Sequence, residues 1–192
     1  MVRMRCCIIR SLIKDKPEKF FRLWIWKGWD IIMEIERKFL MDRFPEGMVP
    51  VDTFEMRQGY LCNSPTIRIR SRLHHDGKSD YRLCFKGKGT LARQETEIEI
   101  SAETFSELSR LLPIPPVIKE HRVYAIDGNY MLECNRVEPG SDTEFYYAEV
   151  EFDTVEAARE FVPPAFLGRE VTETPGYSMG SYWKRKLALL KK

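Results

Sequence analysis

Long apolar runs are missing from this sequence. No stretch of about 18 consecutive apolar residues occurs, so we expect no membrane-spanning helix and no membrane partner. Cysteines are few: the chain has five, an odd number without CxxC spacing, which argues against a zinc site and against a disulfide framework. Free thiols are typical of the reducing cytoplasm, and we expect the protein to be cytoplasmic.

A strong net charge is also missing. The 192 residues suit one domain, and their contents of 43% hydrophobic and 31% charged residues are typical of a globular protein with many charges. The net charge is +2, but residues 1–33 hold eight Lys/Arg and three Asp/Glu, which leaves 23 basic and 26 acidic residues in the remainder. A weakly acidic domain is a poor candidate for a nucleic-acid binder, since such proteins usually present a basic surface.

The first 32 residues differ from the rest. Arg and Lys interrupt their apolar residues every few positions, so the unbroken apolar stretch of a secretory signal is absent. A basic, aromatic segment of this kind could lie on a membrane surface. We favour another interpretation: residues 1–32 are an extension that is disordered or not translated, with translation starting at Met33, and residues 33–192 form the functional domain.

From Glu34 onward, charged and apolar residues alternate with the period of two that is typical of β-strands. The alternation is found in residues 34–39, 66–70, 81–88, 93–100, 133–135 and 149–152. Turn signals separate these segments at 75–78, 127–129 and 138–140. Three stretches are helical instead: 101–112 and 154–162, capped by Ser101 and Thr154, and the tail from Ser181. Many short strands at close spacing predict a sheet or a barrel.

The usual interpretation of such strands is that apolar residues face the core and charges face the solvent. Two observations oppose it. The charges are sorted by sign within strands, with Arg68 and Arg70 on one face and Glu149 and Glu151 on another, whereas a solubilising surface usually mixes signs. The predicted amphipathic helices could also cover the apolar face of the sheet. A barrel with charges inside and apolar residues outside is therefore a workable architecture.

A charged barrel interior needs compensation. Two like charges about 5 Å apart cost roughly 3 kcal/mol at an effective dielectric constant of 20, so several cations gather only where carboxylates and a polyanionic ligand offset them. Arginine pairs suit bidentate binding of phosphate oxygens, and carboxylate pairs suit a hard cation such as Mg²⁺. Together these residue types indicate a site for a complex of a metal with a polyphosphate.

The segment Glu34-Ile35-Glu36-Arg37-Lys38 matches an ExExK motif that is weak evidence when it stands alone. Further motifs follow it in order: Gln-Gly-Tyr-Leu at 58–61, Thr-Ile-Arg-Ile-Arg at 66–70, Phe-Lys-Gly at 85–87, Arg-x-Glu-x-Glu at 93–97, Ala-Glu-Val-Glu-Phe at 148–152 and Leu-Gly-Arg-Glu-Val-Thr at 167–172. In this combination the chain resembles the CYTH domain family, also called triphosphate tunnel metalloenzymes, from about Met33 to Arg185.

The resemblance implies an α+β, mainly β fold: a closed eight-stranded antiparallel barrel, the triphosphate tunnel, with flanking helices on the outside. It also implies a cofactor, Mg²⁺ or Mn²⁺, and a role for each matching residue. The expected catalytic residues are Glu34, Glu36 and Lys38; the substrate-binding residues are Lys38, Arg68, Arg70, Lys86, Arg93 and Arg122; the metal ligands are Glu34, Glu36, Glu149 and Glu151; and further acidic tunnel residues are Glu95, Glu97 and Glu133.

Two positions depart from the family pattern. The family often has Lys-x-Arg where this chain has Lys119-Glu120-His121-Arg122. Since Lys119 and Arg122 fall on opposite faces of a regular strand, we expect only Arg122 to face the tunnel. Where relatives often carry Glu-x-Asp, this chain has Glu133 and Asn135, which keeps the oxygen atom of the second residue but loses its charge.

The resemblance is strongest to compact bacterial inorganic triphosphatases, so the expected activity is metal-dependent hydrolysis of a linear triphosphate, with inorganic tripolyphosphate favoured as the small-molecule partner. Thiamine-triphosphatase and class IV adenylate cyclase are alternatives within the family. A non-catalytic polyphosphate- or nucleotide-binding module is an alternative from another class. A homodimer is compatible with the sequence, but no motif indicates one.

Overall fold

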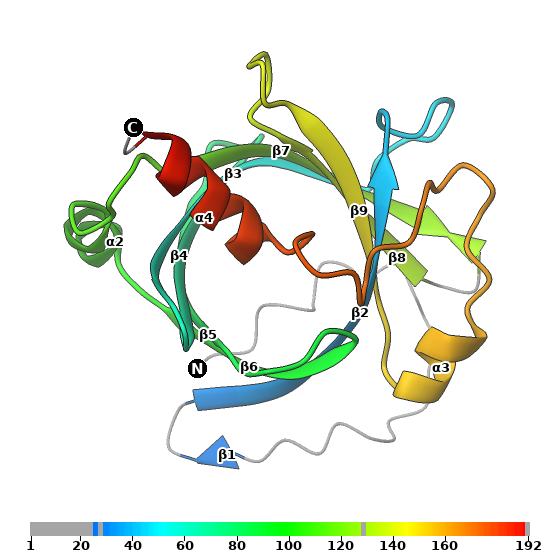
Figure 1. Cartoon of the computed structure of the whole chain (residues 1–192), viewed down its shortest axis with the longest axis horizontal. Helices are drawn as coiled ribbons and strands as arrows, with labels where there is room; N and C mark the ends of the chain where they lie inside the picture. The colour runs from blue at the N-terminus through cyan, green and yellow to red at the C-terminus, as the bar shows by residue number, and fades with distance from the viewer. Residues whose placement is uncertain (1–24, 27–28, 128–129, 191–192) are drawn as a thin grey trace.

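Nine antiparallel strands and three helices make up the part of the chain that the computed structural model describes, residues 25–26, 29–127 and 130–190 (Figure 1). The strands are β1 (Ile25–Trp26), β2 (Trp29–Met41), β3 (Asp52–Asn63), β4 (Thr66–His74), β5 (Ser79–Lys86), β6 (Ala92–Glu99), β7 (Val117–Ile126), β8 (Tyr130–Val137) and β9 (Phe145–Glu151). The helices are α2 (Ala102–Ser109), α3 (Val155–Glu160) and α4 (Met179–Leu190).

Eight of these strands close into a barrel. Their order is β2-β6-β5-β4-β3-β7-β8-β9, and β9 pairs with β2 to complete the ring. The long strand β2 makes the closure because its first half pairs with β6, as in Glu34 opposite Arg93, and its second half pairs with β9, as in Lys38 opposite Glu149. The predicted closed eight-stranded antiparallel barrel is therefore confirmed.

The largest apolar core lies outside the barrel. Alternate residues of β2, β8 and β9, such as Phe39, Leu132 and Val150, are buried on the outer face and pack against Ala158 and Phe161 at α3. Since the period of a strand is two, the residues between them face inward. This places the charged residues of the same strands inside the barrel, as the sorting by sign indicated.

The predicted helix caps are confirmed. The Ser101 hydroxyl accepts a hydrogen bond from the Thr104 amide at the start of α2, and the Thr154 hydroxyl accepts one from the Ala157 amide at the start of α3. Both helices lie outside the barrel, as expected (Figure 1). Leu112, which follows α2 in the chain, packs closely on β3. A Cβ atom at Gly59 would lie 2.4 Å from the Leu112 side chain, which explains the glycine of the Gln-Gly-Tyr-Leu motif.

Helix α4 takes a position that the sequence did not indicate. It lies across one end of the barrel in Figure 1 rather than on its outer face. Trp183 of α4 is fully buried and packs with Tyr60, Val117, Val137 and Tyr147, which come from inward-facing strand positions. The apolar side of α4 therefore closes one end of the tunnel.

The prediction for residues 1–32 falls largely outside the described residues. Of this segment, the structure describes β1 and the first part of β2, where Asp30, Ile31 and Ile32 pair with β6. Strand β2 thus begins four residues before Met33, and a translation start at Met33 stays a prediction. Within the described residues, no helix has the length and apolar character needed to cross a membrane.

The burial of the outer core leads to a prediction about stability. Phe39 is 1% exposed, and we expect Phe39→Ala to lower the free energy of unfolding by roughly 3–5 kcal/mol through lost burial and a cavity. The same substitution at Phe166, which is 46% exposed, should cost well under half as much. Urea denaturation of both variants measures the two values. Equal losses would contradict the assignment of the core to the outer face.

Candidate functional site

The inside of the barrel carries segregated charge. Strands β8 and β9 contribute only carboxylates among their charged inward-facing residues, and β4 and β5 contribute mainly guanidinium and ammonium groups. The charged inward-facing residues are Glu34, Glu36 and Lys38 of β2, Asp52 of β3, Arg68, Arg70 and Arg72 of β4, Asp80, Arg82 and Lys86 of β5, Arg93, Glu95, Glu97 and Glu99 of β6, Lys119 of β7, Glu133 of β8, and Glu149 and Glu151 of β9. In the ring order, β4 and β5 lie opposite β8 and β9.

Like charges meet on the acidic side. The register places Glu36 directly opposite Glu151 and Glu133 directly opposite Glu149. Directly opposed like charges destabilise a sheet. Burial, and then the carboxylates of Glu149 and Glu34, raise the pKa of Glu36 to about 7. Partial burial and Glu149 raise the pKa of Glu133 to about 7, and Glu133 raises that of Glu151.

Cations compensate the remaining carboxylates on this side. The Lys38 ammonium donates to Glu149 at 3.0 Å, and Lys86 and Arg93 contact Glu34 at 2.7 and 2.6 Å. Burial alone would raise the pKa of Glu149, but Lys38 and Lys119 outweigh it and hold the pKa at about 2. Lys86 and Arg93 likewise outweigh burial at Glu34 and hold its pKa below the usual range. Glu34 and Glu149 are therefore ionised at neutral pH.

The basic side offers donors for an anion. Arg68 and Arg70 reach Glu95 and Glu97 at 3.5 and 2.5 Å. Each of the two arginines also keeps a buried Nε without a hydrogen-bond partner among the described residues. A buried donor without a partner is costly, so a ligand that accepts from it gains affinity. Phosphate oxygens are acceptors of the kind that arginine binds well.

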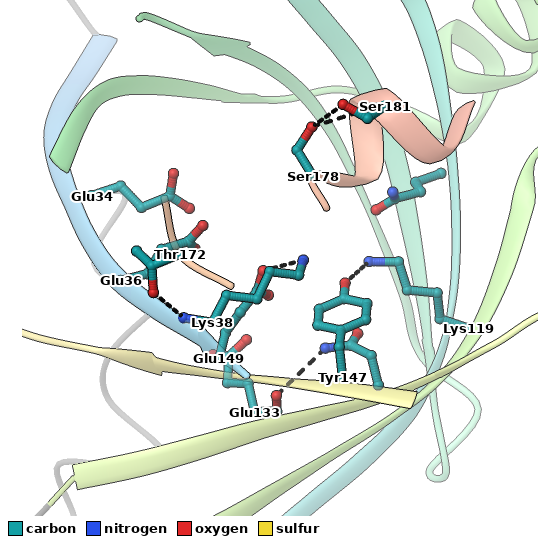
Figure 2. Close-up of polar contacts among 12 residues, drawn as sticks. Glu34, Glu36, Lys38, Lys119, Glu133, Tyr147, Glu149, Thr172, Ser178 and Ser181 are labelled. Atoms are coloured by element: carbon teal, nitrogen blue, oxygen red, sulfur yellow. Dashed lines mark hydrogen bonds and ion pairs between the residues drawn. The ribbon is translucent and has the colours of Figure 1, made fainter. Parts of the chain in front are cut away.

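Lys119 and Arg122 of β7 take positions opposite to those expected. Arg122 lies on the outer face, where its guanidinium pairs with Glu120 and covers the ring of Phe44, and its side chain is 36% exposed. Lys119 is 3% exposed and points into the barrel, where it donates to the Tyr147 hydroxyl at 2.6 Å (Figure 2). Burial lowers the pKa of Lys119 well below its usual value. The expectation that Arg122, and not Lys119, faces the tunnel is therefore wrong: Lys119 is the inward-facing residue.

The reason for this error is local. Charged residues occur on both faces of β7. One face carries Val117, Lys119 and Val123, and the other carries Glu120 and Arg122, so the period of two does not identify which face is the inner one. The tertiary structure decides, because Val117 contributes to the buried cluster under α4. Residues 117, 119, 121 and 123 therefore face inward.

His121 and Asn135 are further tunnel residues that were not assigned a role from the sequence. Both are buried, and His121 Nδ1 lies 3.0 Å from Asn135 Oδ1. The His121 ring stacks on Phe54 with centroids 4.4 Å apart. Burial lowers the pKa of His121 to about 3, so the ring is neutral. The sequence signal for His121 is its position two residues after Lys119, on the same face of the strand. This signal identifies a tunnel residue only when the inner face of β7 is known.

A second acidic group lies on the basic side. Cys84, Glu95 and Glu97 have ligand atoms within 4.8 Å of one another. Arg68 and Lys86 already neutralise Glu95, and Arg70 neutralises Glu97. Burial raises the pKa of the Cys84 thiol to about 11, so it is protonated at neutral pH. This group therefore suits a divalent metal less well than the acidic side does.

Apart from Arg122, the residues expected from the sequence face one interior space. Figure 2 shows Glu34, Glu36 and Lys38 of β2 pointing toward the same region as Lys119, with Ser178 and Ser181 at the edge of this region. A divalent cation fits the acidic side, because it would relieve the opposed pair Glu36 and Glu151 with hard oxygen ligands. The protein is thus a closed antiparallel β-barrel whose charged interior has a carboxylate side suited to a metal ion and a cationic side suited to phosphate.

Comparisons with known proteins agree with this class. A family model for the CYTH domain matches residues 33–182. An inorganic triphosphatase of Nitrosomonas europaea is 37% identical over 144 residues, which cover 75% of this chain and 92% of the relative. The chain belongs to the CYTH domain family.

Solved structures show the same fold. The structure of the inorganic triphosphatase NE1496 superposes with a TM-score of 0.55 at 30% identity, over 77% of this chain and 95% of that chain. The PH1819 protein from Pyrococcus horikoshii OT3 gives a TM-score of 0.56 at 18% identity, over 82% of this chain and 99% of that chain, and shows the fold alone.

The raised pKa of Glu36 predicts a pH-dependent effect of neutralising this residue. Between the ordinary pKa of 4.5 and the folded value of about 7, the folded state holds a proton that the unfolded chain has released. The metal-free protein therefore loses stability as the pH rises through this window, and Glu36→Gln removes that loss. In EDTA, the stability of Glu36→Gln relative to wild type should increase between about pH 5 and about pH 8, as measured by urea denaturation.

The control for this prediction is Glu107→Gln, which makes the same substitution at an exposed position of α2. Its stability relative to wild type should not change over the same pH range. A flat difference for Glu36→Gln would show that Glu36 is not held in a repulsive carboxylate cluster.

Proposed function

We propose that the protein hydrolyses inorganic triphosphate in a metal-dependent reaction inside the barrel. The observation that carries this proposal is the segregation of charge, with opposed carboxylates on β2, β8 and β9 and guanidinium groups on β4. The relative from Nitrosomonas europaea is an inorganic triphosphatase, and the chain covers 92% of it, which supports the same activity here.

The cationic residues bind the phosphates in this proposal. Lys38, Arg68, Arg70, Lys86 and Arg93, together with Lys119, occupy inward-facing positions of the barrel. In the ligand-free protein most of these groups pair with tunnel carboxylates, such as Lys86 with Glu34 and Arg70 with Glu97. Phosphate oxygens would take over part of these contacts, and the buried Nε atoms of Arg68 and Arg70 would gain an acceptor.

The acidic residues bind the metal in this proposal. Glu34, Glu36, Glu149 and Glu151 are the ligands assigned by motif, and Mg²⁺ or Mn²⁺ is the expected ion. A bound divalent ion supplies charge that stabilises the transferring phosphoryl group, and it makes water more acidic. Glu36 and Glu151 would hold the ion together, and its charge would favour their ionised forms by offsetting their mutual repulsion.

Catalysis would then consist of positioning and charge neutralisation, which dominate phosphoryl transfer. Because the carboxylates and the arginines lie on opposite sides of the barrel, a triphosphate would be held between them along its length. Helix α4 limits access at its end of the barrel, where Trp183 and Tyr60 form an apolar layer.

The first test is an assay of phosphate release from tripolyphosphate, ATP and thiamine triphosphate, each with Mg²⁺, Mn²⁺ or EDTA. We expect metal-dependent release that is fastest with tripolyphosphate, and Glu36→Gln should reduce kcat on the order of a hundredfold or more, because it removes a charged metal ligand. Binding of tripolyphosphate without turnover under all conditions would instead favour a non-catalytic module, and formation of cyclic AMP from ATP would favour a cyclase.

The reversed positions of Lys119 and Arg122 give a second test. Lys119→Gln should raise KM for tripolyphosphate roughly tenfold or more, because a bound polyanion would favour the protonated form of Lys119 and the substitution replaces that ammonium by a neutral amide. Arg122→Gln should leave KM unchanged, since Arg122 pairs with Glu120 outside the barrel. Steady-state kinetics measure both, and thermal unfolding of each variant checks that it is folded. A larger effect at Arg122 would contradict the orientation of β7.

A further inference from the structure

His121, Asn135 and Glu133 form a group of inward-facing residues on β7 and β8. His121 and Asn135 are directly opposite in the register, and His121 is only 3% exposed. The Asn135 Nδ2 lies 3.5 Å from the backbone oxygen of Glu133, so the Oδ1 of the amide faces the imidazole, 3.0 Å from its Nδ1. An amide oxygen only accepts hydrogen bonds, so the hydrogen of the neutral ring lies on Nδ1. The other ring nitrogen, Nε2, therefore presents a lone pair.

This lone pair faces a carboxylate. His121 Nε2 lies 3.6 Å from Glu133 Oε2, which is longer than a hydrogen bond. A carboxylate oxygen also carries lone pairs, so two possible ligand atoms face each other across a short gap without a hydrogen bond between them. The stack of Phe54 on the ring, with centroids 4.4 Å apart, holds the imidazole plane in this direction. Glu149 lies directly opposite Glu133 in the register, and its carboxylate accepts from the Lys38 ammonium at 3.0 Å.

We propose that His121 Nε2 and the Glu133 carboxylate form a binding position for a transition metal ion such as Mn²⁺. This inference rests on the proposed function, whose acidic side it extends by a nitrogen ligand. A divalent ion bonds to nitrogen and oxygen ligands at about 2.0–2.2 Å, so one ion fits between two ligand atoms that are 3.6 Å apart.

The ligand types determine which ion this position favours. Mg²⁺ is a hard cation that binds oxygen ligands and keeps several waters, whereas imidazole nitrogen is typical of sites for transition ions. A metal-bound histidine usually donates its other N–H to a neighbouring acceptor, which fixes its tautomer. Asn135 is such an acceptor here. The group therefore matches a histidine ligand together with the residue that orients it.

The test uses the full chain with bound Mn²⁺ and no substrate. Electron spin echo envelope modulation of the Mn²⁺ signal should show coupling to a nitrogen, and the coupling should change to that of ¹⁵N when the protein is made with ¹⁵N-labelled histidine. The chain has three histidines, so single substitutions assign the signal. His121→Gln should remove the coupling, whereas His75→Gln, the same change at an exposed turn, should keep it.

Metal affinity provides a second measurement. His121→Gln should raise the Kd for Mn²⁺ roughly tenfold or more, while the Kd for Mg²⁺ changes by a smaller factor. Free Mn²⁺ measured by electron paramagnetic resonance gives the first value, and competition by Mg²⁺ gives the second. Thermal unfolding in EDTA checks that the variant is folded.

Bound Mn²⁺ without histidine nitrogen coupling in the wild-type protein would overturn the inference, and this measurement requires no variant. The result would not affect the proposed triphosphatase activity, which phosphate release tests separately. Nitrogen coupling in a protein that releases no phosphate would instead support the metal position and contradict the proposed function.

Discussion

Charged side chains inside a closed barrel must be compensated, and the rest of this structure depends on that requirement. At an effective dielectric constant of about 20, a pair of like charges about 5 Å apart costs roughly 3 kcal/mol. The protein offsets this cost on most strands by placing cations and carboxylates within contact distance, as in Lys38 with Glu149 and Arg93 with Glu34. On β2, β8 and β9 the compensation is incomplete, because Glu36 faces Glu151 and Glu133 faces Glu149. The incomplete part of the network is therefore where a cation would be bound most strongly.

The same requirement explains why the main apolar core lies outside the barrel. Each strand has only two faces, so a charged inner face leaves the outer face to supply the apolar burial that stabilises the fold. Residues such as Phe39 and Val150 do this under α3. Helix α4 adds a second apolar cluster at one end, where Trp183 packs on inward-facing residues. The barrel is thus stabilised around and at one end of a charged interior rather than through it.

His121 shows how the residue type at one inward position changes the charge of such an interior. An arginine at this inward position would add a permanent positive charge, whereas burial keeps the imidazole neutral against the opposing effect of its hydrogen bond with Asn135. This part of the tunnel then has acceptors, Nε2 and the Glu133 carboxylate, where a cationic residue would have donors. The cationic and the acidic sides of the interior therefore meet near β7, between Lys119 and His121.

Much of the architecture could be predicted from the sequence. The period-two alternation, the sorting of charges by sign and the caps at Ser101 and Thr154 are local signals, and local signals determine strands, faces and helix starts. Because Glu34, Glu36 and Lys38 share one face of a strand by spacing alone, their common direction needed no tertiary information. The family motifs then indicated the closed barrel.

Other features were decided only by the tertiary structure. Strand β7 carries charges on both faces, so its inner face became clear only from the packing of Val117 under α4. The opposition of Glu36 to Glu151 depends on the register between β2 and β9, which lie more than a hundred residues apart in the chain. The position of α4 depends on which apolar surface is left uncovered after the barrel closes. The sequence by itself thus determined which residues alternate and carry charge, whereas closure, register and packing determined which of them face one another, because those contacts join segments with no local relation.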